Sequence, residues 1–302
     1  MEAAAEPGCV LALDVGGTKL AAGVVDHRGA LLDRAQTPTP RWAGAEGEPA
    51  GAEALFAEVL GLLAALPPSS PAALGVGCGG PMSGLTSEAG AEVSPLNIPA
   101  WRAFPLAARL AEATGLAVFV DNDAKALARG EGWVGAAAGR ASFMSMVVST
   151  GVGGGIVLDG RLLEGAAGNA GHVGHVIVAP EGRWCACGAR GCLEAEASGP
   201  SIEAATGRPA AHAGPEVRAR TGRLVGRAAA SVCNLLDLQL VTVAGSVALG
   251  FGAAFFDAAQ EELDRSCRLL HSRGARITPA GLGADGPLVG AGAVAWAGLR
   301  GR

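Results

Sequence analysis

The sequence contains no tyrosine, and other aromatic and charged residues are scarce. Aromatic residues make up 4% of the 302 residues and charged residues 17%, while half are hydrophobic. The 23 basic and 28 acidic side chains give a formal net charge of −5. This mild acidity argues against a nucleic-acid-binding protein, which usually carries a basic stripe. The apolar content argues against a disordered chain, and the length indicates about two domains.

The N-terminal residues lack the basic region and the long apolar region of a secretory signal peptide. The longest weakly polar run, 241–256, is interrupted by Thr, Ser and several Gly. It falls short of the roughly 18 apolar residues of a membrane span. We therefore expect a soluble, cytoplasmic protein without a membrane partner. In that compartment a dense group of cysteines indicates a metal site rather than a disulfide.

Short apolar runs, glycine turns and helically spaced leucines alternate along the chain. The runs predicted as strands are 9–14, 20–25, 30–37, 74–77, 116–120, 142–149 and 240–243. The stretches predicted as helices are 55–66, 124–129, 217–236, 255–270 and 289–299. Because strands alternate with helices, the predicted class is α/β.

Two segments repeat one local design, a strand followed by a glycine turn. They are residues 14–18 and 149–153, and each is a candidate start of one of two similar halves. We place a boundary near Asp121, which gives a smaller N-terminal α/β domain over 1–120 and a larger α/β domain over 121–289. The C-terminal helix, at about 290–302, is an element that can pack back on the first domain.

The two glycine turns suggest phosphate binding. Backbone N–H groups of a turn after a strand can point at phosphate oxygens, and Asp14 at the strand end can hold a hydrated Mg²⁺. The second turn, 150–155, has the same design without the carboxylate. A tight hairpin is the alternative interpretation, because each turn leads into another strand. Neither turn has the Gly-Lys-Ser/Thr sequence that opens the helix of a P-loop.

Asp123 is the best candidate for a general base. It lies at a predicted strand end and helix start, where ligands gather in open α/β sheets, and the helix dipole favours its ionised form. An ionised carboxylate can accept the proton of an attacking hydroxyl in phosphoryl transfer. A plain helix cap is the alternative interpretation. Asn122 beside it can hydrogen-bond a polar ligand.

One histidine and three cysteines form the strongest metal pattern in the sequence. His175, Cys185, Cys187 and Cys192 follow one another at intervals of 10, 2 and 5 residues. One His and three Cys make a closed tetrahedral set, typical of structural zinc sites. Glycines beside Cys187 and Cys192 permit a tight knuckle over 175–192. A set of free thiols is the alternative interpretation.

These motifs occur together in one order and cover almost the whole chain. The segments are LDVGGTK (13–19), GVGCGGP (75–81), NIP with Trp101 (97–101), DNDA (121–124), STGVGGG (149–155), GH (174–175) and CACGARGCLE (185–194). They resemble the motifs of the repressor, open-reading-frame and kinase (ROK) family of bacterial sugar kinases and sugar-sensing repressors. A DNA-binding repressor is not expected, because the 13 residues before Asp14 are too few for a helix-turn-helix module.

The resemblance implies an actin-like ATPase, or sugar-kinase, fold of the ribonuclease H-like type, with two domains flanking a cleft. It implies ATP-dependent phosphorylation of the primary hydroxyl, O6, of a hexose, with Asp123 as the base. The residues implied in sugar binding are Gly80, Asn97, Asn122, His175 and Glu194. Those implied around the ATP phosphates and Mg²⁺, or near adenosine, are Asp14, Gly16, Gly17, Thr18, Lys19, Thr150, Gly151, Gly153 and Gly245. A structural Zn²⁺ on His175, Cys185, Cys187 and Cys192 and a homodimer or homotetramer are also implied.

Two positions depart from the family pattern. The family usually has Glu three residues before the zinc-binding His, and here that residue is His172. A carboxylate accepts from two hydroxyls, whereas a neutral imidazole offers one donor and one acceptor, so we expect His172 to bind the sugar differently. The alternatives are a kinase for an amino sugar or cyclitol, or a non-catalytic sugar-binding regulator. The adenosine-side turn, often three glycines, reads Ala244-Gly245-Ser246, which we interpret as an exchange of small residues.

Overall fold

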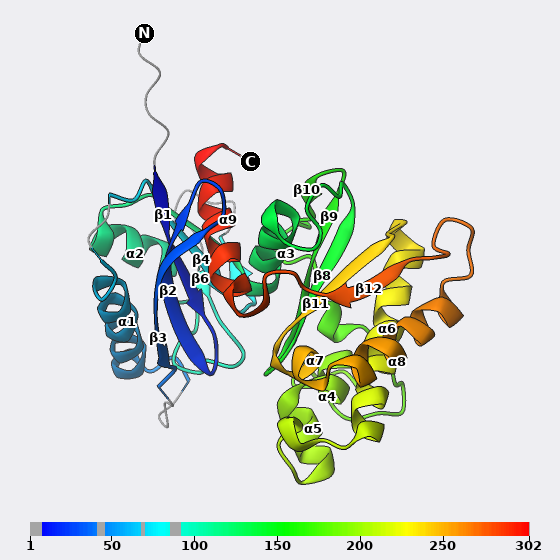
Figure 1. Cartoon of the computed structure of the whole chain (residues 1–302). Helices are drawn as coiled ribbons and strands as arrows, with labels where there is room; N and C mark the ends of the chain where they lie inside the picture. The colour runs from blue at the N-terminus through cyan, green and yellow to red at the C-terminus, as the bar shows by residue number, and fades with distance from the viewer. Residues whose placement is uncertain (1–7, 41–45, 68–69, 85–91, 302) are drawn as a thin grey trace. The chain divides into compact units, whose positions relative to one another are not determined.

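The computed structural model of the chain describes residues 8–40, 46–67, 70–84 and 92–301 (Figure 1). The chain forms two compact units. Unit 1 extends to Val134 and also contains Glu164–Ala170 and the C-terminal segment from Ala284, whereas unit 2 consists of Gly135–Leu163 and Gly171–Gly283. The predicted second domain, 121–289, therefore contains three parts of unit 1, namely residues 121–134, Glu164–Ala170 and residues 284–289.

Unit 1 is built on a five-stranded mixed sheet. Its strands are β1 (Cys9–Val15), β2 (Lys19–Asp26), β3 (Leu31–Pro38), β4 (Leu74–Cys78) and β7 (Val118–Asn122). The spatial order is β3-β2-β1-β4-β7, in which β1, β4 and β7 are parallel while β2 is antiparallel to both of its neighbours. A two-stranded sheet pairs β5 (Met82–Ser83) with β6 (Glu92–Val93). The helices are α1 (Pro49–Ala64), α2 (Leu106–Thr114), α3 (Asp123–Val134) and α9 (Gly286–Leu299).

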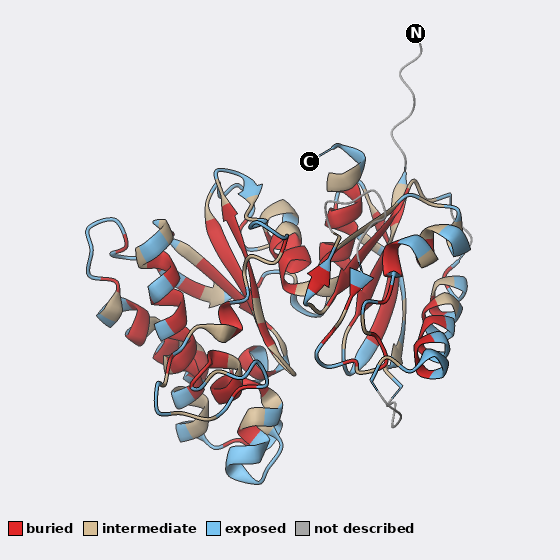
Figure 2. Cartoon of the chain, turned by 180° about the vertical axis from the view of Figure 1, so that it is seen from behind, coloured by how far each residue is buried: buried red, intermediate tan, exposed pale blue. Residues whose placement is uncertain are grey.

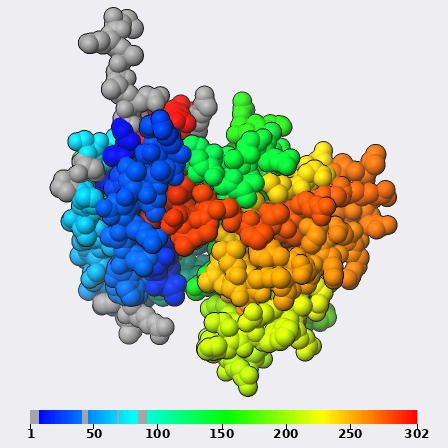
Figure 3. Space-filling model, in the orientation of Figure 1, coloured from blue at the N-terminus to red at the C-terminus, as the bar shows by residue number. Residues whose placement is uncertain are grey.

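Successive side chains of the central strand β1 enter two different cores, because they alternate between the faces of the sheet. Leu13 packs in a core that includes Val59 of α1 and Leu110 of α2. Its neighbour Ala12 packs on the opposite face with residues of α9 such as Leu288. Figure 3 shows C-terminal residues beside N-terminal residues, and α9 contacts β1, β2 and β4 although these strands lie far from it in sequence. The last helix thus packs back on unit 1.

Unit 2 contains a second five-stranded sheet. Its strands are β8 (Phe143–Val148), β9 (Val152–Leu158), β10 (Arg161–Leu162), β11 (Leu240–Ala244) and β12 (Arg276–Pro279). Its helices are α4 (Leu193–Ala197), α5 (Gly199–Thr206), α6 (Pro215–Leu236), α7 (Ser246–Phe251) and α8 (Ala253–Ser266), with short 3-10 turns η1 (Val173–His175), η2 (Ala210–His212) and, at the return to unit 1, η3 (Gly283–Asp285). Figure 2 shows buried strands and helices whose outward faces are exposed.

The two sheets have the same topology. In unit 2 the order is β10-β9-β8-β11-β12, with β9 antiparallel to β8 and β10 and with β8, β11 and β12 parallel. The hairpin β8–β9 therefore occupies the place that β1–β2 occupies in unit 1. This equivalence agrees with the two similar halves expected from the sequence, and the α/β class is confirmed. Among the described helices, none combines the length and hydropathy that crossing a membrane requires.

Candidate functional site

The carboxyl ends of the parallel strands of unit 1 meet at one edge of the sheet, where ligands gather in folds of this class. Asp14 on β1 lies opposite Gly77 on β4, and Gly77 lies opposite Asp121 on β7. A Cβ built on Gly77 would lie 3.9 Å from Oδ1 of Asp14 and 3.6 Å from Cα of Asp123. The Asp14 carboxylate and the first residue of α3 therefore lie on either side of a residue without a side chain.

Burial and like charge disfavour the ionised form of Asp14. Asp14 is buried, with 9% of its surface exposed. Burial and, next, the Asp123 carboxylate raise the pKa of Asp14 to about 7, while Lys19 acts in the opposite direction. Burial and these same two carboxylates also raise the pKa of the Cys78 thiol. Asp14 and Asp123 thus share one electrostatic environment, in which a nearby cation would favour the ionised form of both.

The beginning of α3 is capped by Asn122. Its side-chain Oδ1 accepts hydrogen bonds from the backbone N–H groups of Ala124 at 3.1 Å and Lys125 at 3.4 Å, as an N-cap residue does. Asp123 Oδ1 also accepts from Ala124 N–H, at 2.8 Å. Helix capping, the alternative role considered for Asp123, is thus already provided by Asn122. Capping alone therefore does not explain why the first residue of α3 carries a carboxylate.

The first glycine turn is a tight hairpin turn between β1 and β2. Gly16 N–H donates to the carbonyl of Lys19 at 3.1 Å. Thr39 holds the turn from outside, because its Oγ1 donates to the Gly16 carbonyl at 2.6 Å and its N–H donates to the Thr18 carbonyl at 3.0 Å. The turn leads into a strand, as expected, and not into the helix that a P-loop requires.

This turn contacts the segment that carries Asn97. A Cβ on Gly17 would lie 2.7 Å from Cβ of Asn97 and 3.1 Å from its carbonyl oxygen, so only glycine allows so close an approach. Leu96 N–H donates to the carbonyl of Gly80 at 3.3 Å, which places Gly80 beside the same segment. The structure thus brings Gly17, Gly80 and Asn97 together in unit 1.

The second glycine turn packs against the turn over 244–246. The hydroxyls of Ser149 and Ser246 hydrogen-bond at 3.0 Å. Gly245 has a φ of 100°, and a Cβ there would overlap the carbonyl of Val148, so position 245 requires glycine. The predicted nucleotide-side residues that lie in these two turns, or next to them on β9, are Thr150, Gly151, Gly153 and Gly245.

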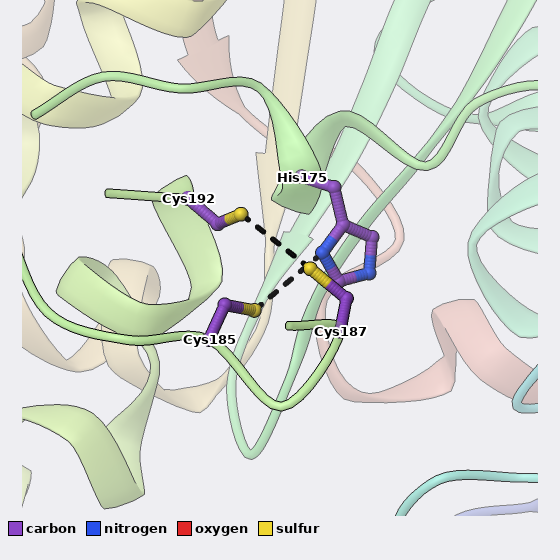
Figure 4. A group of neighbouring side chains, drawn as sticks. All are labelled: His175, Cys185, Cys187 and Cys192. Carbon is purple, nitrogen blue, oxygen red and sulfur yellow. Dashed lines mark hydrogen bonds between the residues drawn. The ribbon is translucent and has the colours of Figure 1, made fainter. Parts of the chain in front are cut away.

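Figure 4 shows the predicted zinc ligands converging within unit 2. The ligand atoms of His175, Cys185, Cys187 and Cys192 all lie within 4.8 Å of one another. Cys185 Sγ lies 3.7 Å from His175 Nδ1, and Cys187 Sγ lies 3.7 Å from Cys192 Sγ. Thiolates bound tetrahedrally to zinc at about 2.3 Å are about 3.8 Å apart. The donor set and its spacing are therefore compatible with structural zinc.

The three cluster cysteines differ in acidity as thiols. Burial, followed by the neighbouring thiols, raises the pKa of Cys192 to about 12. Burial raises the pKa of Cys185, whereas a backbone hydrogen bond from Ala189 lowers the pKa of the exposed Cys187. Because zinc binds thiolates, metal binding at this cluster must release protons and weaken at low pH.

The segments that carry the cysteine cluster also carry two residues implied in sugar binding, His175 and Glu194. Cys192 immediately precedes α4, which carries Glu194, and Glu194 Oε2 accepts from Val152 N–H at the start of β9 at 2.8 Å. His175 is the last residue of η1. The exposed His172 precedes η1, and its ring centroid lies 6.1 Å from that of His175. His172, His175 and Glu194 are thus carried by segments that the cluster joins.

Sequence patterns did not identify a group of charged residues beside Asp123. Lys125, on the first turn of α3, is 1% exposed and pairs with Asp121 and with Glu164. Asp121 and Lys125 are only four residues apart, but Asp121 lies on β7 and Lys125 on α3, so helical spacing does not predict their contact. Glu164 lies 39 residues away in sequence, so no local pattern connects it to α3.

Comparison with known proteins gives a consistent result over nearly the whole chain. The sequence profile of the ROK family matches residues 10–297. An N-acetylmannosamine kinase of Haemophilus influenzae (strain PittEE) is 37% identical over 257 residues, which cover 80% of this chain and 82% of that protein.

Two solved structures show the same fold. The ROK hexokinase of Thermus thermophilus is 34% identical with a TM-score of 0.76, over 97% of this chain and 100% of that one. A ROK family glucokinase of Streptomyces griseus, in complex with glucose and AMPPNP, is 29% identical with a TM-score of 0.80, over 96% and 99%. The predicted actin-like fold is therefore confirmed. Profile, relatives and fold agree with the motif resemblance, and the chain belongs to the ROK family.

Proposed function

We propose that this protein transfers the γ-phosphoryl group of ATP to a hydroxyl group of a hexose or modified hexose. The observation that supports this most is the placement of Asp14 and Asp123 on either side of Gly77, at the carboxyl ends of parallel strands. That pair combines a carboxylate suited to a hydrated cation with a carboxylate at a helix start. The kinases among the relatives support the same class of reaction.

In the proposed reaction, the sugar hydroxyl oxygen attacks the γ-phosphorus while its proton passes to the Asp123 carboxylate. The new bond joins oxygen and phosphorus, and the bond from the γ-phosphorus to the bridging oxygen breaks to release ADP. Asp14 and the 16–19 turn would hold Mg²⁺ and phosphates, together with Thr150 and Gly151 of the second turn. Mg²⁺, when bound, neutralises charge on the phosphates. Asn122 fixes the start of α3 and so orients Asp123.

On the sugar side, we propose that His175 and Glu194 hold ring hydroxyls and that Asn97 and Gly80 line the same substrate. His175 would bind Zn²⁺ through Nδ1, which faces Cys185, and leave Nε2 for the sugar. A metal-bound histidine has a fixed tautomer, so its second nitrogen offers one defined hydrogen bond. Zinc, when bound, supplies rigidity to this part of unit 2 and no chemistry.

We further propose that the substrate is an N-acylated hexosamine, with N-acetylmannosamine phosphorylated at O6 as the first candidate. His172 supports this choice, because an imidazole stands where the family usually has a carboxylate that accepts from two hydroxyls. The 37% identity to N-acetylmannosamine kinases supports it independently. A cyclitol kinase and a sugar-binding regulator without turnover are the competing functions.

A coupled ADP-release assay with Mg-ATP tests the proposal. The panel contains N-acetylmannosamine, N-acetylglucosamine, glucose, mannose, allose, 3-amino-3-deoxyglucose and cyclitols, with Asp123→Asn as the inactive control. We expect turnover on N-acetylmannosamine that the control loses, and a product phosphorylated at O6 by NMR. The His172→Glu variant should shift preference toward glucose. Sugar-induced thermal stabilisation without turnover on any compound would favour the regulator instead.

A further inference from the structure

A buried lysine lies two residues after the proposed base. Lys125 is 1% exposed, and its ammonium group has three partners. Its Nζ pairs with Asp121 Oδ1 at 3.1 Å and with the Glu164 carboxylate, and it donates to the Gly168 carbonyl at 2.9 Å. Two of the three N–H donors of the ammonium group make hydrogen bonds, to Glu164 and to Gly168, and Asp121 adds a second carboxylate to balance the buried charge.

Arg129, one turn further along α3, closes the group. Its Nε lies 3.4 Å from Asp121 Oδ2, and its Nη2 lies 3.2 Å from Glu164 Oε1. Each carboxylate therefore contacts both cations, and the four charges sum to zero. Because an unpaired buried charge is strongly destabilising, this arrangement fixes the position of Glu164 relative to α3.

The segment that Glu164 begins has an unusual place in the fold. Glu164–Ala170 belongs to unit 1, although the chain on both sides of it belongs to unit 2. Its other end is also fixed in unit 1, because Asn169 Oδ1 accepts from Met82 N–H at 3.2 Å and Asn169 Nδ2 donates to the Met82 carbonyl at 3.0 Å. Met82 follows the Gly80–Pro81 turn, which lies beside the Asn97 segment.

Hydrophobic packing does not explain why this segment is held. None of its seven residues, all of which the structure describes, contributes a side chain to the buried hydrophobic core. Its attachment to unit 1 rests on the ion pairs of Glu164, the Gly168 carbonyl and the Asn169 amide. The segment ends two residues before His172, a residue proposed to contact the sugar. The charges of α3 therefore hold a short segment whose chain continues directly to His172.

We infer that Lys125 and Glu164 are positioning residues for the sugar. By tying Glu164–Ala170 to the helix that begins with Asp123, they set the place of Asn169 and of the chain that leads to His172. The inference rests on the proposed function and extends it to residues that touch neither reactant. It requires that loosening the tie weakens sugar binding more than it weakens ATP binding or the fold.

The Glu164→Gln variant tests this most directly, because Glu164 is half exposed and its loss leaves Lys125 paired with Asp121. We expect the KM for the sugar to rise about tenfold, which corresponds to about 1.4 kcal/mol. The KM for ATP and the melting temperature should stay close to wild type. Glu53→Gln is the matched control, since Glu53 is a half-exposed partner of Arg109 in the same unit, outside the site. It should change neither KM.

Lys125→Gln and the double variant complete the test. Glutamines at both positions can hydrogen-bond as a neutral pair. The sugar KM of the double variant should therefore be no higher than the higher of the two KM values of Glu164→Gln and Lys125→Gln. Additive losses, an unchanged sugar KM in Glu164→Gln, or equal losses for sugar, ATP and stability would overturn the inference. A wild-type protein without turnover on any sugar would instead overturn the proposed function. The sugar Kd values of the wild type and the variants, measured by calorimetry, would then test the positioning role of Lys125 and Glu164. Wild-type protein that binds no sugar would overturn both.

Discussion

The carboxylate of Asp123 disfavours ionisation of Asp14, and the two residues lie on either side of the bare backbone of Gly77. Burial is the larger cause, and the two together raise the pKa of Asp14 to about 7. Two nearby carboxylates repel each other when both are ionised, and an added positive charge offsets that repulsion. The edge of the unit 1 sheet is therefore prepared for a cation, and its two acids have different proposed tasks, one toward the cation and one toward the proton of the substrate.

Asp123→Asn should abolish most turnover without preventing sugar binding. The amide keeps an oxygen where Asp123 Oδ1 accepts from Ala124 N–H, and Asn122 still caps α3, so the helix start should persist. Loss of a general base lowers the rate by about 10²–10⁴-fold. ADP release measures the rate, and calorimetry measures the sugar Kd, which should change little. A variant that keeps a tenth or more of the wild-type rate would show that Asp123 is not the base.

Asp14→Asn should change how stability depends on pH. The pKa of Asp14 is about 7 in the folded protein against 3.8 ordinarily, so the folded state holds this proton more tightly than the unfolded state. Its stabilising effect is present below pH 4 and is lost as the pH rises through about 7. The asparagine variant lacks this loss.

Urea unfolding at pH 5 and pH 8, without added Mg²⁺, measures the effect. Between these pH values the unfolding free energy of the wild type should fall more than that of Asp14→Asn, by a difference on the order of 2 kcal/mol. Equal changes in the two proteins would mean that Asp14 ionises normally in the fold. The same variant should lose activity at every pH, because an amide cannot replace a carboxylate toward a cation.

Local pattern was sufficient for the strands and the hairpins but not for the boundary between the units. Apolar runs predicted β1, β2, β4 and β8 within one residue at each end, whereas β9 was expected only as a strand without bounds after the second glycine turn. The boundary was placed before α3, whereas α3 packs against α9 and β4 of unit 1. Such contacts join residues far apart in sequence and leave no periodic signal. β12 was also missed, because Arg276–Pro279 has a single buried side chain, Ile277, and ends in proline.

The candidate site divides in a similar way. Asp14, Asp123 and the cysteines were found because each lies in a short motif whose residue types suggest one chemistry. Lys125 was missed because a lysine on a helix is usually exposed, and its burial depends on Glu164 from another part of the chain. The contact between Gly17 and Asn97 was equally invisible, since it depends on how two loops approach each other.

Gly17→Ala should damage the site through Asn97. The added Cβ would lie 2.7 Å from Cβ of Asn97 and 3.1 Å from its carbonyl, and both groups are parts of backbone segments that cannot rotate away. We expect kcat/KM to fall about tenfold or more for the sugar and for ATP, since the turn and the Asn97 segment must separate. Gly61→Ala is the matched control, because nothing lies within 4 Å of its new Cβ in the last turn of α1.

The control should be as active as the wild type and equally or slightly more stable, because alanine is favoured over glycine inside a helix by about 1 kcal/mol. Steady-state kinetics and thermal melts of the three proteins measure the comparison. Wild-type kinetics in Gly17→Ala would show that the loops can separate freely, and that their contact does not determine the geometry of the site.

The Cys187→Ser variant should weaken zinc binding and sugar binding but leave ATP binding nearly unchanged. Cys187 is the exposed ligand of the cluster, so a serine there should disturb packing little. The substitution nevertheless removes a thiolate ligand. Loss of a residue that only supports a metal ligand already costs about 10–100-fold in metal affinity, so loss of a ligand itself should weaken zinc binding strongly. We expect less than one zinc per chain after dialysis, a lower melting temperature, and a raised sugar KM, because His175 and Glu194 lie on segments that the cluster joins. The KM for ATP should change little.

Cys9→Ser, which alters a cysteine outside the cluster, should keep its zinc and both KM values. A Cys187→Ser protein with full zinc content and an unchanged sugar KM would show that the cluster does not order the sugar-binding residues.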